Sequence, residues 1–249
     1  MKPVTLEQAR VPDGVRIYAV GDVHGRHDLL VKLFEKIEAD AAAAPEQQRE
    51  LIFLGDYIDR GLYSRQTLDW LMDFDARPEG QRYRLTCLKG NHEELLLKFL
   101  RDPASGQVWL ENGAYETLLS FGLKLSSPRP KPETFRHLSQ QLHSKLEGNY
   151  LKFLSERTLG RTVGDYFFCH AGIDPDKSLK TQKPESLLWI RDKFLQSDKK
   201  HEKIIVHGHS ISALPDVRPN RIGIDTGAYG TGRLTALVLS GNNRSFLYS

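Results

Sequence analysis

Charged residues directly follow an apolar run in the first half of this sequence, and their types are those that bind metal ions or phosphate. The run is residues 51–54; after Gly55 come three charged residues, Asp56, Asp59 and Arg60. In an open α/β sheet, ligands bind beyond the carboxyl ends of the strands. Two carboxylates and a guanidinium are costly to bury there unless they hold a metal ion, a phosphate or both. The stretch therefore predicts a binding site, although a turn alone would explain Gly55 and Asp56.

Other strand-like runs end in the same way. Apolar, β-rich runs at residues 15–20, 83–88, 166–169 and 204–206 are each followed by Asp, Asn or His. The residues at these ends are Asp22, His24, Asn91, His92, His170 and His209. A lone histidine at a strand end is more often structural, but this recurrence at one sheet edge predicts a metal site. Oxygen and imidazole ligands without thiolate are typical of manganese, iron or zinc, and they argue against a structural zinc site.

The elements that must position these residues alternate along the chain. In the first hundred residues, strand, polar turn and helix follow one another repeatedly, which predicts an α/β fold. Apolar positions recur mostly at helical spacing over residues 102–160, interrupted by a Pro- and Ser-rich loop at 126–132. We interpret this segment as a helical insertion that caps the α/β core. Strand-like runs then return, with residues 234–239 closing the sheet.

Composition narrows the class of protein. The 249 residues are enough for one large domain or two small ones, and 39% apolar and 27% charged residues are an ordinary globular balance. Because we interpret the helical segment as an insertion, we expect a single domain over residues 1–249. A net charge of +3 is too small to argue for a nucleic-acid partner, and no apolar run approaches the roughly 18 residues of a membrane span. Two cysteines, Cys87 and Cys169, lie in apolar runs and are expected to be buried free thiols. We therefore expect a cytoplasmic protein with neither nucleic-acid nor membrane partners.

Several blocks of this sequence resemble those of a known family. Gly21-Asp22-Val23-His24-Gly25, Gly55-Asp56-Tyr57-Ile58-Asp59-Arg60-Gly61 and Leu88-Lys89-Gly90-Asn91-His92-Glu93 are similar to the three signature blocks of the phosphoprotein phosphatases. His170-Ala171-Gly172 and Gly208-His209 are similar to that family's two later metal-binding blocks. This is the branch of the calcineurin-like metallophosphoesterases that includes serine/threonine phosphatases and the phage lambda phosphatase. The segment after Gly227 resembles the bacterial and phage form.

The resemblance implies a fold and a metal centre. The fold would be a four-layer αββα sandwich, in which two mixed sheets are flanked by helices. One divalent ion would be held by Asp22, His24 and Asp56. A second would be held by Asp56, Asn91, His170 and His209, with Asp56 as the shared bridge. Manganese is the leading candidate, and iron and zinc are the others.

The resemblance also implies catalytic roles. His92 would be the general acid that protonates the leaving oxygen, and Asp59 would orient and charge it. A carboxylate partner that keeps an imidazole protonated near neutral pH makes chemical sense without the resemblance. Arg60 would bind the phosphate through its planar fork, and Arg191 is the expected second phosphate arginine. The attacking group would be a metal-bridging hydroxide, with no covalent enzyme intermediate.

The leading functional hypothesis is hydrolysis of phosphoserine and phosphothreonine in proteins, with phosphotyrosine or a small phosphoester as further substrates. Two alternatives stay open: a hydrolase of dinucleoside polyphosphates such as diadenosine tetraphosphate, and a non-catalytic phosphate-binding scaffold. A scaffold would be expected to have lost at least one ligand residue, and none is missing here. Four other residues are not expected to bind metal. His207 is expected to be structural, and His27 and His201 are expected to be exposed. Asp225 is expected to support the site. The oligomeric state does not follow from the sequence.

Overall fold

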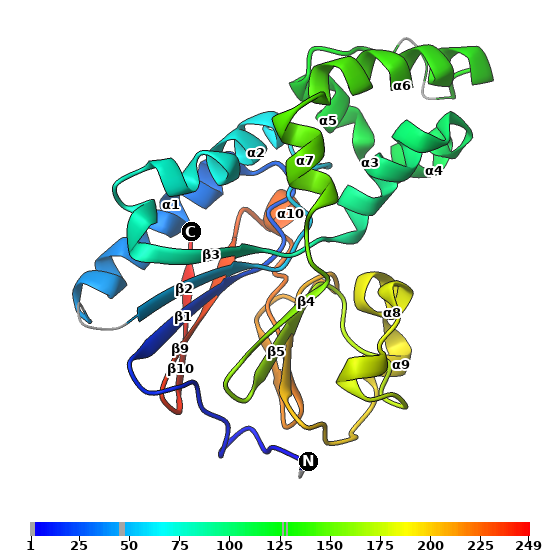
Figure 1. Cartoon of the computed structure of the whole chain (residues 1–249). Helices are drawn as coiled ribbons and strands as arrows, with labels where there is room; N and C mark the ends of the chain where they lie inside the picture. Colours follow the sequence, from blue (N-terminus) through cyan, green and yellow to red (C-terminus); the bar gives the residue numbers. More distant parts are fainter. Residues whose placement is uncertain (1–2, 45–47, 126, 128) are drawn as a thin grey trace.

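Two five-stranded sheets form the centre of the protein (Figure 1). The computed structural model describes residues 3–44, 48–125, 127 and 129–249. The first sheet has the strand order β10-β9-β1-β2-β3 and the second the order β4-β5-β6-β8-β7. The strands of the first are β1 (Val15–Val20), β2 (Gln48–Phe53), β3 (Tyr83–Cys87), β9 (Thr235–Ser240) and β10 (Asn243–Tyr248). Those of the second are β4 (Gly160–Val163), β5 (Tyr166–Cys169), β6 (Ile204–His207), β7 (Asp216–Arg218) and β8 (Arg221–Gly223).

Both sheets are mixed, and in each of them three neighbouring strands run parallel and end next to the predicted site. β1, β2 and β3 are parallel neighbours in the first sheet, as are β5, β6 and β8 in the second. The remaining strands are antiparallel additions, with β9 and β10 beside β1, β4 beside β5, and β7 beside β8. The carboxyl ends of three parallel strands therefore lie together in each sheet.

The sheets pack face to face, and the period of two along each strand separates their two faces. On β1, Ile17 and Ala19 lie in the apolar cluster between the sheets, together with Phe168 of β5. The alternate residues Tyr18 and Val20 lie in the cluster formed with the helices. The inner strands β1, β5 and β6 are therefore buried on both faces, which explains their nearly continuous apolar runs.

Helices cover the outer face of each sheet. On the first sheet lie α1 (His27–Ala42), α2 (Ser64–Met72) and α3 (Asn91–Arg101), whose apolar side chains share one cluster with β1, β2 and β3. On the second sheet lie α8 (Pro184–Trp189) and α9 (Asp192–Leu195), packed on Phe167 and Ile205. The order helix, sheet, sheet, helix confirms the predicted fold class.

Between α3 and β4 the described residues form helices. These are the 3-10 turn Pro103–Ser105, α4 (Gly106–Glu111), α5 (Ala114–Ser120), α6 (Pro132–Leu146) and α7 (Asn149–Ser155), which gather at one end of the molecule (Figure 1). Their buried residues, including Trp109 and Leu142, belong to the same cluster as α1 and the first sheet. Residues 126 and 128 of the predicted loop lie outside the described residues. The remaining short helices are α10 (Ala228–Thr231) and the 3-10 turns Phe74–Ala76, Gly80–Arg82 and Leu179–Thr181.

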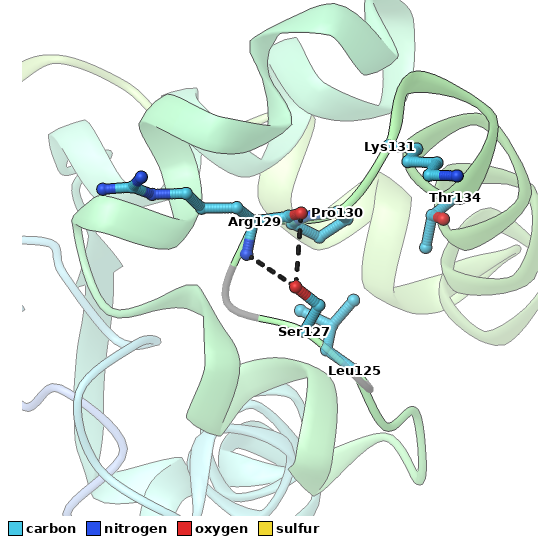
Figure 2. Close-up of a pocket in the computed structure, with 6 residues that line it drawn as sticks. All are labelled: Leu125, Ser127, Arg129, Pro130, Lys131 and Thr134. Carbon is cyan, nitrogen blue, oxygen red and sulfur yellow. Dashed lines mark hydrogen bonds between the residues drawn. The ribbon is translucent and has the colours of Figure 1, made fainter.

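A pocket of about 240 Å³ opens in this helical segment, between the chain before α6 and α6 itself (Figure 2). Its walls are Leu125, Ser127, Arg129, Pro130, Lys131 and Thr134. The hydroxyl of Ser127 accepts from the backbone N–H of Arg129 and donates to its carbonyl, at 3.2 and 3.3 Å. None of these residues is a predicted site residue.

The structure differs from the expected elements where polar residues are buried by distant partners. β2 begins at Gln48 rather than at residue 51, and Arg49 and Glu50 are buried within it. Arg161 of β4 supplies the reason, because its guanidinium lies 2.9 Å from the Glu50 carboxylate. Strands β4, β7 and β10 were not expected from their short or polar sequences. Cys87 and Cys169 are buried and free as predicted, and no helix in the described residues is long and apolar enough to cross a membrane.

Leu33 tests the packing of α1, the helix that follows the first predicted ligand turn. Its side chain is fully buried in the cluster that joins α1 to the first sheet. Leu33→Ala should lower the free energy of unfolding by about 2–5 kcal/mol, because the lost contacts leave a cavity. Urea unfolding followed by circular dichroism measures the change. The neighbouring exposed Lys32 is the control, and Lys32→Ala should stay within about 0.5 kcal/mol; equal losses in both variants would contradict this packing.

Candidate metal and phosphate site

The predicted ligand residues lie together where the carboxyl ends of the two sheets meet. Asp22 and His24 follow β1, Asp56 follows β2, Asn91 begins α3 after β3, His170 follows β5, and His209 follows β6. All of them are buried. Residues from distant parts of the sequence thus form one compact polar cluster inside an apolar frame.

Asp56 lies at the centre of this cluster. Its Oδ2 is 3.4 Å from His24 Nε2 and 3.7 Å from His92 Nε2, and its Oδ1 is 3.5 Å from His170 Nε2. Burial alone would raise the pKa of this carboxyl, but the surrounding imidazoles of His170, His92 and His24 outweigh burial and lower it. Asp56 is therefore the carboxylate best placed to be shared between two ions.

In His24 and His170, the hydrogen bond of the ring nitrogen that points away from the cluster determines which nitrogen faces the cluster. His24 Nδ1 donates to the carbonyl of Ile58 at 2.9 Å, and His170 Nδ1 donates to the carbonyl of Leu54 at 3.0 Å. Backbone carbonyls are the usual outer partners of metal-binding histidines. In both neutral rings, Nε2 therefore carries a lone pair directed at Asp56.

The donor set fits a divalent cation. His170 Nε2 is 2.7 Å from Asn91 Oδ1, so two acceptors face each other with no proton between them. His209 Nδ1 lies 3.2 Å from the same His170 nitrogen, and Asp22 Oδ1 is buried without a hydrogen-bond partner. Such converging lone pairs repel one another unless a cation lies among them.

The protonation states agree with this fit. Burial lowers the pKa of His24 to about 3, and burial followed by the His170 charge lowers that of His209 to about 2. Neutral imidazole is the form that binds metal ions. Burial, then the charges of Asp225 and Asp56, raises the pKa of Asp22, while burial raises that of Asp225 to about 6. The carboxyl groups of Asp22, Asp56 and Asp225 thus receive no positive charge from the neutral rings of His24 and His209.

Two subsets of the cluster have ligand atoms within 4.8 Å of one another. One is His24, Asp56 and His92, and the other is Asp56, His170 and His209. The second agrees with the ligands expected for one ion. The first contains His92 in place of Asp22, whose Oδ2 instead accepts from the backbone N–H of His209 at 3.0 Å.

The backbone of the site is strained. In the described part of the chain, the non-glycine residues with positive φ are all predicted site residues: His24, Asp56, Asp59, Arg60 and His209, with φ between 45° and 71°. Each such residue costs on the order of 1–3 kcal/mol and persists only where its surroundings enforce it. Gly90 packs so closely against the Asp56 turn that a Cβ there would lie 2.1 Å from Asp56 Oδ1, so only glycine fits at this position.

Glu93 enforces the same turn, and its role was not foreseen from the sequence. Its carboxylate accepts from the backbone N–H groups of Asp56, Tyr57 and Gly90 at 2.8–2.9 Å. Burial and the Asp56 charge raise the pKa of Glu93 to about 7, whereas the three donors favour its carboxylate form. Glu93 thereby ties the turn after β2 to the turn before α3.

His92 and Asp59 form a buried pair beside the ligand cluster. His92 Nδ1 lies 2.7 Å from Asp59 Oδ2, and neither side chain is more than 1% exposed. Burial lowers the pKa of His92, but the charges of Asp56 and Asp59 and the hydrogen bond to Asp59 outweigh burial and raise it. The pair therefore favours a protonated imidazole, whereas burial lowers the pKa of His24, His170 and His209.

The two predicted arginines reach the cluster from different sides. Arg60 Nη1 lies 3.1 Å from His24 Nε2, and its guanidinium lies over the ring of Tyr229 at 4.9 Å. Arg191 Nη1 donates to the carbonyl of His209 at 3.4 Å. Tyr229 and Trp189, which sequence reasoning did not single out, are each 39% exposed and contact His24 and His209 through their rings.

The remaining candidates are not among the predicted ligands. His207 is buried, with Nδ1 on the carbonyl of Gly208 and Nε2 3.4 Å from Arg221 Nη1, which fits a structural role. His27 and His201 are half-buried, so the expectation of exposure was wrong for both. Asp225 is buried and accepts from the backbone N–H of Gly227. No spacing in the sequence distinguishes these contacts, because each depends on a partner brought in by the fold.

Comparison of the sequence with known protein families identifies the family of this chain. Residues 15–231 match the calcineurin-like phosphoesterases. The chain belongs to that family. The catalytic subunit of serine/threonine-protein phosphatase 4 from Eremothecium gossypii is 43% identical over 159 residues, which are 63% of this chain and 38% of that protein. The chain spans less than half the length of the curated relatives it matches, with shares between 28% and 45%.

Solved structures of this calcineurin-like phosphoesterase fold are similar over nearly the whole chain. The cold-active protein-tyrosine phosphatase of a psychrophilic Shewanella species has a TM-score of 0.56 and 15% identity, covering 96% of this chain and 83% of that one. A protein provisionally described as a diadenosine tetraphosphatase has a TM-score of 0.57 and 18% identity, covering 94% and 93%. At these identities the likeness shows a shared fold.

His209 tests the metal fit. His209→Ala should weaken Mn²⁺ binding by more than about tenfold, the loss seen when even an outer partner of a metal ligand is removed. Isothermal titration of chelator-treated protein measures the affinity. Saturating the wild type at about 100 times Kd should add about 2.7 kcal/mol of stability, visible as a higher Tm. His27→Ala is the control outside the cluster; unchanged binding in His209→Ala would contradict the ligand assignment.

Proposed function

We propose that this chain is a dimetal-dependent phosphomonoesterase that hydrolyses phosphoserine and phosphothreonine in proteins. One observation carries the proposal. Unprotonated ligand atoms converge on the buried carboxylate of Asp56, and the hydrogen-bonded pair His92–Asp59 lies directly beside it. A Lewis-acid site next to a proton donor is what phosphoester hydrolysis requires.

The ligands in this proposal are those expected from the sequence. Asp22, His24 and Asp56 would hold one ion, and Asp56, Asn91, His170 and His209 the other, with manganese as first choice and iron or zinc as alternatives. When bound, the two ions would acidify a water molecule for attack and neutralise charge on the phosphoryl oxygens. The protein's contribution is to hold these side chains in one strained, buried arrangement.

His92 serves as the general acid in this proposal. Asp59 holds its Nδ1, which directs Nε2 toward the Asp56 side of the cluster. There His92 can deliver its proton to the oxygen of the departing serine or threonine. An alkoxide is a poor leaving group, so proton delivery is the step in which the chain's own residues contribute most.

Arg60 and Arg191 bind the phosphate oxygens. They lie at His24 and His209, so they can contact a phosphate from two sides of the cluster. Tyr229 restrains Arg60 through its ring, and a planar guanidinium matches two phosphate oxygens at once.

Two considerations favour a protein substrate. The curated relatives are serine/threonine phosphatases, with identities up to 43%. The exposed rings of Tyr229 and Trp189 border the cluster and offer apolar surface to the residue that carries the phosphate. Diadenosine tetraphosphate is the competing substrate, because an adenine could lie on the same rings.

The buried free thiols Cys87 and Cys169 fit a reducing cytoplasmic location.

A direct comparison of substrates tests the proposed specificity. Manganese-loaded protein should release phosphate faster from a phosphoserine peptide than it produces ADP from diadenosine tetraphosphate, as judged by initial rates at equal concentration. Faster ADP production would assign the chain to dinucleotide hydrolysis. If metal-loaded protein turned over neither substrate, the remaining hypothesis would be a non-catalytic phosphate-binding scaffold.

A single variant tests the general acid. His92→Asn should lower turnover of a phosphoserine peptide by roughly 10²–10⁴-fold, the usual contribution of general acid catalysis. Turnover of para-nitrophenyl phosphate should fall much less, since its leaving group needs little protonation. Metal content, measured by elemental analysis, should stay unchanged. Equal losses on both substrates, or loss of metal, would exclude this role for His92.

A further inference from the structure

The carboxylate of Asp59 receives most of its hydrogen bonds from the helical segment α4–α5. Its Oδ2 accepts from His92 Nδ1 at 2.7 Å and from the indole Nε1 of Trp109 at 2.9 Å. Its Oδ1 accepts from the hydroxyl of Thr117 at 2.6 Å. Trp109 belongs to α4 and Thr117 to α5. Two of the three groups that hold this carboxylate therefore come from outside the signature blocks.

The same segment also holds the backbone of the turn. The N–H of Asp59 donates to Thr117 Oγ1 at 2.8 Å and to Ser64 Oγ at 3.1 Å. The N–H of Arg60 donates to the carbonyl of Gly113, between α4 and α5, at 2.9 Å. Asp59 and Arg60 have φ of 71° and 67°, a conformation that non-glycine residues keep only when their surroundings enforce it. These bonds supply that enforcement.

The chemistry of Trp109 and Thr117 leaves little freedom in this network. The indole N–H can only donate, and the ring is buried against Phe99 at a centroid distance of 5.2 Å. The Thr117 hydroxyl has one proton, which goes to the carboxylate, so its oxygen is left to accept from the Asp59 N–H. Asp59 is fully buried, and both its oxygens are bonded.

We propose that Trp109 and Thr117 are positioning residues for the general acid. They fix the Asp59 carboxylate, which in turn fixes the ring of His92 so that Nε2 faces the Asp56 side of the cluster. The inference rests on the proposed function, because it takes His92 as the proton donor to the leaving oxygen. The helical insertion then supports the catalytic pair His92–Asp59 directly, as well as bordering the site.

The test removes one hydrogen bond at a time and preserves shape. Thr117→Val lacks the hydroxyl, Thr117→Ser keeps it, and Trp109→Phe keeps a ring on Phe99 but lacks the N–H. Thr67→Val is the matched control, since the buried Thr67 hydroxyl of α2 donates to the carbonyl of Tyr63, the residue that precedes this helix. Each manganese-loaded variant is assayed on a phosphoserine peptide and on para-nitrophenyl phosphate, alone and combined with His92→Asn. Metal content and Tm are measured in parallel.

Thr117→Val and Trp109→Phe should each slow the peptide reaction by roughly tenfold, the fold-change expected for a lost hydrogen bond to a charged group. On para-nitrophenyl phosphate the loss should stay below about threefold, and Thr117→Ser should recover most of the rate. Combined with His92→Asn, neither variant should slow the peptide reaction further, because the residues act through His92.

Two results would overturn the inference, and they have different meanings. Equal losses on both substrates, or losses that persist in the His92→Asn background, would make Trp109 and Thr117 structural only. That result leaves the proposed function intact if His92→Asn alone still distinguishes the leaving groups. If His92→Asn slows both substrates equally, the general acid assignment fails, and the positioning role fails with it.

Discussion

The structure depends on keeping the carboxylate of Asp56 buried among imidazoles. Its two oxygens lie 3.4–3.7 Å from Nε2 atoms of His24, His92 and His170, in a left-handed backbone conformation. A buried charge persists only if it is paired, and a strained turn persists only if it is enforced. The Glu93 carboxylate meets the second condition by binding the backbone N–H of Asp56. A bound cation would meet the first, because burial keeps His24 and His170 neutral and the charge of His92 is shared with Asp59.

The sandwich of two sheets makes this arrangement rigid. Side chains such as Ile17, Leu54, Phe168 and Val206 fill the layer between the sheets directly below the site, without exposure to solvent. Close-packed interiors do not deform continuously, so the strand ends above them stay at fixed separations. Ligands from both sheets can therefore converge to within hydrogen-bond distance, as His170 and Asn91 do at 2.7 Å. The free energy that offsets the local strain comes from this apolar layer and from the helices outside it.

The fold and the ligand cluster could be predicted from sequence because both leave local signals. Apolar runs mark the buried strands, and the Asp, Asn or His after each run marks the shared edge. What could not be predicted depends on partners far along the chain. Glu50 lies in a strand because Arg161 pairs with it, and Thr117 reaches Asp59 only because α5 packs beside the turn after β2. A tryptophan or threonine in a helix has no local pattern that separates such a role from ordinary packing.

The charges divide the site into an inner and an outer region. The inner region holds Asp22, Asp56 and Asp225 with neutral histidines between them, so it attracts cations and repels phosphate. The outer region holds the guanidinium groups of Arg60 and Arg191, which attract phosphate. Opposite charges a few ångströms apart in a buried site interact strongly. Without positive charge in the inner region, a phosphate dianion near the arginines would face uncompensated carboxylates. Under the proposed function, productive binding of a phosphoester would require the inner region to be neutralised first, which would make the predicted ligand cluster a condition for substrate binding as well as for chemistry.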